Sequence, residues 1–299
     1  MERIPVSVIV MTKNEESNIA KCLAGLTDFA EVFVVDSRST DNTCAIAESY
    51  GAKVVQFDWN GRYPKKKQWC LKELPCTYPI LLYVDADEEM SPELAAEIRA
   101  CLPKFSQGYG GAFVGFDYVF AGKKLAYGHR VFKLVLVHQA SSEFLDYDDL
   151  DAANMWEVEG HYQPAIKGRT FALKHRMLHD DHDSLYHYFD KHNRYSDWEA
   201  QLRSKGLMND PREANLGLRS MMKKVLDNLP FKPLISFLHS YILKFGFLDG
   251  AAGFHYAMAR ATYYWQIGLK MDELAARKQT KLVRPGVVTA RPATKESAT

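Results

Sequence analysis

The chain has 299 residues, of which 47% are hydrophobic and 25% charged, and its formal net charge is +1. These values fit one large α/β domain, or one domain with a helical extension, and the balanced charge argues against nucleic acid as a partner. The five cysteines form no CxxC pair, which favours a reducing compartment. The apolar N-terminal run looks like a first strand rather than a signal peptide, and no run of 18 uncharged apolar residues indicates a membrane span. We therefore expect a cytoplasmic protein.

The first half of the chain alternates short apolar runs with helical patterns. The β-branched runs at 6–12 and 31–36 predict strands buried on both faces, and the segment between them has helical spacing. The alternation continues with a helix over 42–50, a strand at 53–57, a helix over 65–73 and a strand at 80–85. Strand–helix–strand units of this length predict an open, mostly parallel sheet with right-handed crossovers.

The next elements have clear start signals or apolar runs. Ser91 is placed to cap a helix that has Pro92 at its first position. Two apolar runs between 112 and 137 predict strands, which we interpret as the antiparallel part of the same sheet.

The chain becomes helical from about Ser184, and the segment 231–245 has the clearest amphipathic pattern. Its apolar face consists of Phe231, Leu234, Ile235, Leu238, Tyr241, Ile242 and Phe245. Such a helix can pack on the sheet domain. Alternatively it can lie in a membrane interface, with nearby lysines facing anionic lipid; these are Lys223, Lys224, Lys232 and Lys244. We favour peripheral contact with the inner face of the plasma membrane.

Three polar clusters fall at predicted strand ends: TKNEE at 12–16, VDSRSTDNT at 35–43 and VDADEE at 84–89. Ligands of open parallel sheets bind outside the carboxyl ends of the strands, so this coincidence predicts a binding site. Asp36 could accept hydrogen bonds from a base or a ribose. The alternative is that it only forms a turn and a helix cap.

Asp85 and Asp87 project to the same side of a strand end, so both carboxylates can approach one point. Mg²⁺ and Mn²⁺ favour such oxygens, and a cation would offset the repulsion between them. The alternative is a solvated strand end. We interpret Glu88 and Glu89 as the solvated entry to the next helix.

The segments SVIVMTKNEESNIAKCLAGL, EVFVVDSRSTDNTCAIAESYGAKV and LLYVDADEEMSPEL together resemble the family 2 glycosyltransferases in order, spacing and strand placement. The resemblance covers about residues 5–100 and extends more loosely through GRYPKKKQWCL and HDDHDSLYHYFDKHNRYSDWEA. These later segments are similar to the branch that contains the lipopolysaccharide inner-core β-glucosyltransferases.

The resemblance implies an α/β fold of the GT-A (Rossmann-like) type, with a mostly parallel sheet and a C-terminal α-helical extension. We divide the chain into a catalytic domain at 1–183, a helical region at 184–282 and a disordered tail at 283–299. The implied activity is metal-dependent, inverting transfer of a sugar from a nucleotide-diphosphate donor, expected to be a UDP-sugar. The expected acceptor is a glycan or lipid-linked glycan of the cell envelope. The sequence does not specify the donor sugar, the acceptor or the oligomeric state.

At matching positions the resemblance implies a set of donor-binding residues. Thr12, Asn14 and Glu15 would line the nucleotide pocket, and Asp36 would contact the uracil or ribose. Lys67 and Gln68 would lie near the base or the phosphates, although nothing in the sequence distinguishes Lys67 from the two lysines before it.

The resemblance also assigns the acidic strand end. Asp85 would approach the ribose and sugar, and Asp87 would bind Mg²⁺ or Mn²⁺ on the diphosphate. Within HDDHD (179–183), His179 or His182 could complete the metal site, or the loop could simply cap a helix through Asp183 or Ser184.

Two further residue types bear on catalysis. An inverting transferase needs a general base for the acceptor hydroxyl. The resemblance indicates Glu157, and Glu159 stays an alternative because an extended segment would turn both carboxylates to one side. Arg194 could neutralise the departing diphosphate or form a surface salt bridge.

Other functions stay open at this point. A polyprenyl-phosphate sugar synthase shares the donor chemistry, and a non-catalytic protein could bind the sugar nucleotide without turnover. A nucleotidyltransferase would usually have a Gly-rich basic loop after the first strand, which MTKNEES lacks.

Overall fold

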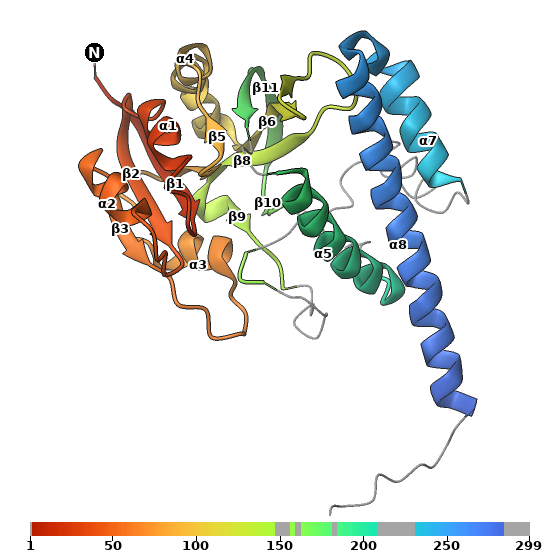
Figure 1. The fold of residues 1–299 in the computed structure, drawn as a ribbon. Helices are drawn as coiled ribbons and strands as arrows, with labels where there is room; N and C mark the ends of the chain where they lie inside the picture. The colour runs from red at the N-terminus through yellow and green to blue at the C-terminus, as the bar shows by residue number, and fades with distance from the viewer. Residues whose placement is uncertain (1, 147–155, 159–162, 181–183, 208–230, 284–299) are drawn as a thin grey trace, which may run out of the picture.

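The computed structural model describes residues 2–146, 156–158, 163–180, 184–207 and 231–283 (Figure 1). The amino-terminal half alternates strands and helices: β1 (Ile4–Thr12), α1 (Ile19–Ala24), β2 (Phe29–Asp36), α2 (Thr43–Ser49), β3 (Lys53–Gln56), α3 (Lys66–Glu73) and β4 (Ile80–Asp85). Each strand and helix predicted for this half is therefore confirmed, with small differences at the ends.

The second part of the sheet is reached through the short strand β5 and a helix. Its elements are β5 (Glu88–Glu89), α4 (Pro92–Cys101), η1 (Leu102–Gln107), β6 (Tyr109–Phe120), β7 (Lys123–Lys124), β8 (Phe132–His138), η2 (Gln139–Ser141), β9 (Ser142–Glu143), β10 (Ala165–Ile166) and β11 (Arg169–His179). The Ser91 hydroxyl accepts a hydrogen bond from Leu94 N, which confirms the predicted cap of α4.

The main sheet has the strand order β3-β2-β1-β4-β8-β6-β11-β5. Strands β1, β2, β3 and β4 are mutually parallel, and β6 and β11 run in the same direction as they do. Strand β8 lies between β4 and β6 and is antiparallel to both, as predicted for the runs between 112 and 137. The result is an α/β sheet of mostly parallel strands.

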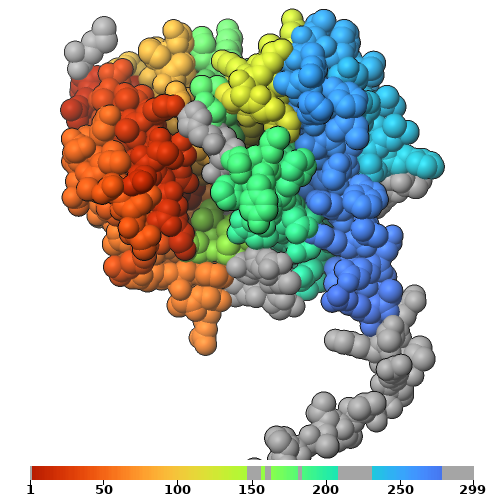
Figure 2. Space-filling model, viewed as in Figure 1, coloured from red at the N-terminus to blue at the C-terminus, as the bar shows by residue number. Residues whose placement is uncertain are grey.

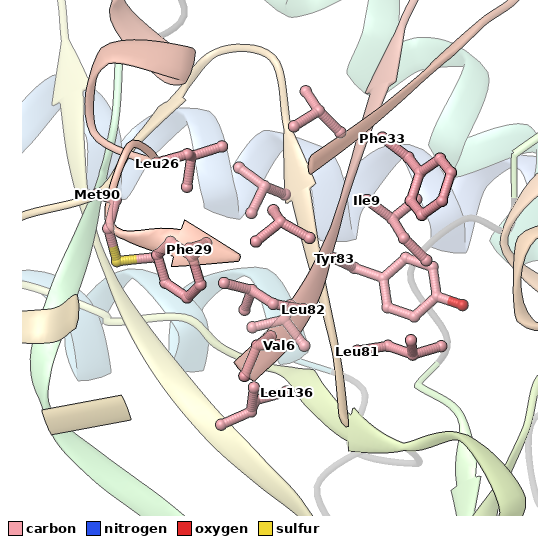
Figure 3. Close-up of a cluster of buried hydrophobic side chains, with 14 of the residues drawn as sticks. Val6, Ile9, Leu26, Phe29, Phe33, Leu81, Leu82, Tyr83, Met90 and Leu136 are labelled. Carbon is pink, nitrogen blue, oxygen red and sulfur yellow. The ribbon is translucent and has the colours of Figure 1, made fainter. Parts of the chain in front are cut away.

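The core lies on both faces of the central strands. Every residue from Val6 to Thr12 is buried, and β4 is buried from Ile80 to Val84. Figure 3 shows Val6, Leu81 and Leu82 packed with side chains of the neighbouring elements. Because both faces are covered, these strands are continuous apolar runs, and each fully buried large side chain contributes about 2 kcal/mol.

Strand β11 was not predicted. Its sequence, RTFALKHRMLH, is rich in basic residues, and only Leu173 and Met177 are buried. It nevertheless pairs with β6 along much of its length and brings His179 opposite Glu88 of β5. Its place in the sheet depends on a distant partner strand rather than on an apolar run of its own.

The carboxyl-terminal elements are helical: α5 (Leu185–Ser204), α7 (Lys232–Leu238), a π-helical turn η4 (His239–Leu243), η5 (Gly246–Asp249) and α8 (Ala251–Val283). Ser184 caps α5 by accepting a hydrogen bond from His187 N. In Figures 1 and 2, α5 lies between the amino-terminal half of the sheet and the long helix α8. The predicted tail lies, apart from Val283, outside the described residues.

The segment 231–245 is not one continuous amphipathic helix, which corrects the sequence-based interpretation. The α-helical part, α7, ends at Leu238, the backbone continues as the π-helical turn η4 to Leu243, and the helical path ends before Phe245, which has a φ angle of 58°. The buried Ser240 accepts a hydrogen bond from His129 N, and Gly128 N donates to Lys244 O. These contacts with the β7–β8 connection stabilise the turn over helical continuation.

Many apolar side chains of this corner are exposed. Phe231, Leu234, Leu238, Ile242, Leu243, Phe245, Phe247, Leu248, Phe254 and Met258 have exposed fractions between 40% and 67%, and we call them the apolar corner. None of the described helices combines the length and hydropathy needed to cross a membrane.

Candidate functional site

The carboxyl ends of three central strands lie side by side, as the polar clusters predicted. Thr12 at the end of β1 pairs in register with Asp36 of β2, and Met11 pairs with Asp85 of β4. The loops that follow these strands therefore meet at one edge of the sheet.

The loops after β1 and β2 hold each other in place. Asn14 adopts a φ of 56°; its backbone N–H donates to Ser39 Oγ over 2.8 Å, and its side-chain oxygen accepts from Thr40 N over 2.8 Å. Glu15 N donates to Thr43 Oγ1 over 2.8 Å. Asn14 thus joins the two loops through both its backbone and its side chain, and Glu15 through its backbone N–H.

Asp36 is fully buried beneath these loops. Its carboxylate accepts hydrogen bonds from Thr12 Oγ1 over 3.0 Å and from Ser39 N over 2.8 Å. Burial alone would raise the pKa of Asp36, but the hydrogen bonds from Ser39 and Thr12 lower it. The structure therefore shows Asp36 organising the Ser39 turn.

The three consecutive lysines at the start of α3 have different surroundings. Lys66 is buried, and its ammonium group donates to Thr12 O over 3.0 Å and to Ser37 Oγ over 2.7 Å. Lys67 is half-buried and close enough to Asp85 for its charge to lower the pKa of that carboxyl. Gln68 is buried, and its side-chain oxygen accepts a hydrogen bond from Phe144 N over 2.8 Å.

Next to these loops, the acidic stretch after β4 folds around Lys133 of β8. Lys133 Nζ lies 3.0 Å from Asp85 Oδ2 and 2.6 Å from Glu88 Oε1. Burial alone would raise the pKa of Asp85, but the ammonium groups of Lys133 and Lys67 lower it below its ordinary value. Asp85 therefore forms an ion pair with Lys133.

Glu88 is not a solvated residue, and that expectation was wrong. It is 1% exposed, and its other oxygen accepts a hydrogen bond from Asp85 N over 3.0 Å. Glu88 and Glu89 form β5, which pairs with the end of β11. Glu88 is therefore buried where β5 pairs with the unpredicted strand β11.

Asp87 and His179 face each other on the other side of Glu88. His179 Nδ1 lies 3.5 Å from Asp87 Oδ1 and 3.7 Å from Glu88 Oε1. Asp87 Oδ1 and His179 Nδ1 are buried and have no hydrogen-bond partner among the described residues. Burial raises the pKa of Asp87, and the neighbouring Asp85 and Glu88 charges act in the same direction.

These three side chains form a candidate metal centre. Asp87, Glu88 and His179 each offer a ligand atom, and the three atoms lie within 4.8 Å of one another. Carboxylate oxygens suit Mg²⁺ and Mn²⁺, imidazole is a common ligand of transition metals, and two buried ligand atoms lack partners. The donor set therefore fits a divalent cation.

The amino-terminal half of the chain matches a known protein family. Residues 7–162, more than half of the chain, match the family model of Glycosyl transferase family 2. The chain belongs to glycosyl transferase family 2.

Several relatives of this glycosyltransferase are known by name. The lipopolysaccharide core biosynthesis glycosyltransferase LpsC of Rhizobium meliloti is 28% identical over 298 residues, which cover 95% of this chain and 97% of LpsC. An uncharacterized glycosyltransferase of Rickettsia felis is 42% identical over 108 residues, 36% of each protein. The chain thus spans about a third of the length of that relative.

Solved structures give weaker likenesses. Staphylococcus aureus TarS 1–349 matches at a TM-score of 0.40 and 17% identity, covering 91% of each chain. Glucosyl-3-phosphoglycerate synthase of Mycobacterium tuberculosis, in complex with Mn²⁺, UDP-glucose and phosphoglyceric acid, matches at a TM-score of 0.32 and 24% identity, covering 38% of this chain and 43% of the synthase.

Helix α5 lies beside the acidic cluster. Tyr195 of α5 is near enough to Asp85 for that charge to contribute to the raised pKa of the phenol, which burial raises most. Trp156 packs against Tyr195, with ring centroids 5.1 Å apart. Arg194 lies 3.3 Å from Asp190 of the same helix and is half exposed, so the structure shows it in a surface ion pair.

Glu157 lies next to Lys66. Its backbone oxygen accepts a hydrogen bond from Lys66 N over 2.8 Å, and its carboxylate is 3.9 Å from Lys66 Nζ. The alternative base Glu159, like His182 and Asp183, lies outside the described residues.

Sequence reasoning missed three residues of this site. Glu88 was taken as solvated, Tyr118 packs on His179 with ring centroids 4.8 Å apart, and Lys133 pairs with two acids. Lys133 interrupts the apolar run RVFKLVLV, and a lone lysine in a buried strand is the signal that could have found it.

Proposed function

We propose that this glycosyltransferase transfers a sugar, with inversion, from a UDP-sugar to a glycan or lipid-linked glycan acceptor of the cell envelope. The observation that supports a nucleotide-diphosphate donor best is the Asp87–Glu88–His179 cluster at the carboxyl end of β4. The acceptor class is supported by the similarity to LpsC, whose name places it in lipopolysaccharide core biosynthesis.

In this proposal Asp87, Glu88 and His179 would hold Mg²⁺ or Mn²⁺. The bound cation would offset the negative charge that develops on the departing nucleotide diphosphate. The loops that carry Thr12, Asn14 and Glu15 would receive the nucleotide, and the rigid hydrogen bonds between them would limit its orientations.

The remaining donor contacts are proposed as follows. Asp36 would support the wall of the base and ribose pocket through the Ser39 turn. Asp85 and Lys67, which are close to each other, would lie at the ribose and the phosphates of the donor. Gln68 would contribute indirectly, by accepting the hydrogen bond from Phe144 N. Arg194 would meet the diphosphate only by leaving Asp190.

Glu157 is our proposed general base for the acceptor hydroxyl, with Glu159 as the alternative. The Glu157 carboxylate is 19% exposed and adjoins the loops of the donor site through Lys66. A carboxylate that remains reachable from solvent can accept a proton from a hydroxyl group that binds next to it.

Contact with a membrane surface is a further part of this proposal. The apolar corner exposes ten large apolar side chains, and Lys232 and Lys244 lie within the same segments. Exposed aromatic and aliphatic residues beside lysines fit the headgroup region of an anionic bilayer. A glycosyltransferase held there would be kept at the surface that carries lipid-linked acceptors.

The decisive experiment measures nucleotide release and sugar transfer with UDP-, GDP-, CDP- and dTDP-sugars in the presence of Mn²⁺. Asp87→Asn should keep its melting temperature but lose at least about a hundredfold in transfer, because one ligand of the cluster is replaced by a neutral group. Glu93→Gln, an exposed acid in the first turn of α4, is the matched control and should retain activity. Full activity of Asp87→Asn in excess EDTA would contradict the metal assignment.

The base is tested separately. Glu157→Gln should bind donor normally and lose transfer, whereas loss only in Glu159→Gln would move the base to that residue. Full activity of both variants would instead favour a phosphate acceptor, as in a polyprenyl-phosphate sugar synthase, because such an acceptor needs no base. Donor binding without release on any acceptor would indicate a non-catalytic protein.

A further inference from the structure

Lys133 places a positive charge inside the acidic cluster. Its ammonium group lies 3.0 Å from Asp85 Oδ2 and 2.6 Å from Glu88 Oε1, and 4.5 Å from the centre of the Phe116 ring. Only 23% of the side chain is exposed. Two carboxylates and the face of an aromatic ring thus hold this cation in one position.

The cluster is consequently divided into two halves. In the described residues, the ion pairs of Lys133 are with Asp85 and Glu88, while Asp87 lies against His179. The unpartnered ligand atoms, Asp87 Oδ1 and His179 Nδ1, are both in the second half. Asp85 therefore differs from Asp87, although the two are separated by one residue.

The charge of Lys133 affects how a metal ion can bind to this cluster. An ammonium group in contact with a carboxylate oxygen competes with a metal ion for that oxygen, and a fixed positive charge next to the cluster opposes the approach of a divalent ion. Glu88, which Lys133 also holds, can offer the metal only its shared oxygen. The protein then supplies few ligands, and Mg²⁺ or Mn²⁺ needs others.

We propose that Lys133 is a positioning residue that serves as a built-in cation, keeps Asp85 out of the metal's ligand set, and leaves the metal weakly bound until the donor diphosphate adds its oxygens. This inference rests on the proposed function. It predicts that metal and nucleotide bind cooperatively and that the protein alone holds Mn²⁺ poorly. Divalent ions held by one or two carboxylates together with substrate phosphates behave in this way.

The test is titration of the full chain with Mn²⁺ alone, with free Mn²⁺ measured by electron paramagnetic resonance. Lys133→Met should bind Mn²⁺ at least tenfold more tightly than the wild type, because the opposing charge is gone and Asp85 is released. Lys133→Arg, which keeps the charge, should stay within about threefold of the wild type. Lys53→Met is the matched control, since it removes a lysine from an ion pair with Glu31 in the amino-terminal part of the sheet, and it should leave Mn²⁺ binding unchanged.

Two further measurements separate Lys133 from a purely structural role. Adding UDP should tighten Mn²⁺ binding more in the wild type than in Lys133→Met. The tighter Mn²⁺ binding expected of Lys133→Met should disappear in the double variant Lys133→Met/Asp85→Asn, because the released Asp85 carboxylate is the additional ligand. Equal or weaker Mn²⁺ binding by a folded Lys133→Met would overturn the inference while leaving the proposed function intact.

If Lys133→Met does not fold, single substitutions of Asp85 and Asp87 in the wild-type chain still test the inference. Asp85→Asn should weaken binding of Mn²⁺ alone by less than tenfold, and Asp87→Asn by at least a hundredfold. Equal losses in the two variants would show that Asp85 is a ligand despite Lys133, and would overturn the inference. These titrations need no acceptor, so a failure to find transfer activity does not affect their outcome.

Discussion

Lys66 and Lys67 are neighbours in sequence with opposite environments. Lys66 is 1% exposed and donates to Thr12 O and Ser37 Oγ, and burial lowers its pKa although Glu157 opposes that effect. Lys66→Met would leave a buried carbonyl and a hydroxyl without their donor. We expect a loss of about 2 kcal/mol in the free energy of unfolding, measured by urea denaturation.

The matched variant is Lys67→Met. Lys67 is half-buried and acts on Asp85 through its charge, so we expect unfolding stability within about 0.5 kcal/mol of the wild type. If Lys67 lies at the phosphates, as proposed, the UDP dissociation constant should rise roughly fivefold, measured by calorimetry with Mn²⁺, because one positive charge is lost there. The opposite pattern, with Lys66→Met stable and deficient in UDP binding, would reverse the assignment of the two lysines.

The site shows what sequence can and cannot predict for single residues. The position of Asp36, Asp85 and Asp87 at one edge of the sheet was predictable, because Asp36 and Asp85 end buried strands and Asp87 follows one. The orientation of Lys66 depends on how α3 rotates against the sheet, and consecutive lysines give no periodic signal. The burial of Glu88 depends on pairing with β11, which has no apolar run of its own.

At the scale of elements, Glu31 ties together strands at the opposite, amino-terminal edge of the parallel sheet. Its carboxylate accepts from Ser7 Oγ of β1, from Thr77 N before β4, and from Lys53 Nζ of β3. Burial alone would raise the pKa of Glu31, but these partners lower it to about 2, from an ordinary value of 4.5. The charged form therefore stabilises the fold above the unfolded-state pKa.

This shift predicts a pH dependence. Glu31→Gln should reduce the free energy of unfolding at pH 7 by about 2 kcal/mol, after allowance for the exposed Lys53 partner. Because the folded pKa is depressed, the difference from the wild type should shrink as the pH falls from about 4.5 towards 2. Urea denaturation at pH 7, 4 and 3 measures it, with the exposed Glu48→Gln as control. A difference that stays constant down to pH 3 would contradict the role of the charge.

The crossing of η5 and α8 is close enough to exclude a side chain. A Cβ atom at Gly253 would overlap the carbonyl oxygen of Gly246 and lie 2.9 Å from Asp249 Cβ. Gly253→Ala should therefore cost at least about 2 kcal/mol in the free energy of unfolding. Gly268→Ala, further along α8, meets none of the described atoms within 4 Å and should stabilise by up to about 1 kcal/mol. Equal melting temperatures for the two variants would show that the crossing is looser than described.

Helices and strands with their own periodicity were predictable, and tertiary contacts account for the exceptions. The parallel strands and their crossover helices follow from apolar runs and caps. The change to a π-helical turn after Leu238 and the end of the helix before Phe245 do not, since this segment bonds to a distant loop, with Ser240 Oγ accepting from His129 N. The pattern of apolar residues at 231–245 describes an exposed surface correctly but assigns it to an uninterrupted helix.

Over the whole molecule, the apolar corner lies far from the parallel end of the sheet, on the side formed by α7 and the start of α8 (Figure 1). If it contacts lipid, Leu243→Asp/Phe245→Asp should reduce co-sedimentation with anionic vesicles at least fivefold. These side chains are 67% and 55% exposed, so the fold should tolerate the change. Tyr50→Asp, at the end of α2 and 47% exposed, is the control. Unchanged sedimentation of the double variant would place any lipid contact elsewhere.

The carboxyl-terminal helices pack against side chains of the sheet. Tyr256 of α8 stacks on Tyr118 with ring centroids 6.4 Å apart, and Tyr118 in turn packs on His179. Phe120 of β6 packs against Tyr188 of α5 and Tyr256. The helical region therefore forms one packed unit with the strands that carry the metal candidates.

The place of β11 has a consequence for recombination between related enzymes. The family match ends at residue 162, but His179 and the strand that covers the edge of β6 come later. A chimera joined at 162 would take Asp87 and Glu88 from one parent and His179 from the other. Its β6–β11 pair would also join strands of two proteins that did not evolve together. Exchange of the carboxyl-terminal helices between relatives should therefore begin after His179, so that the sheet and the candidate metal ligands come from a single parent.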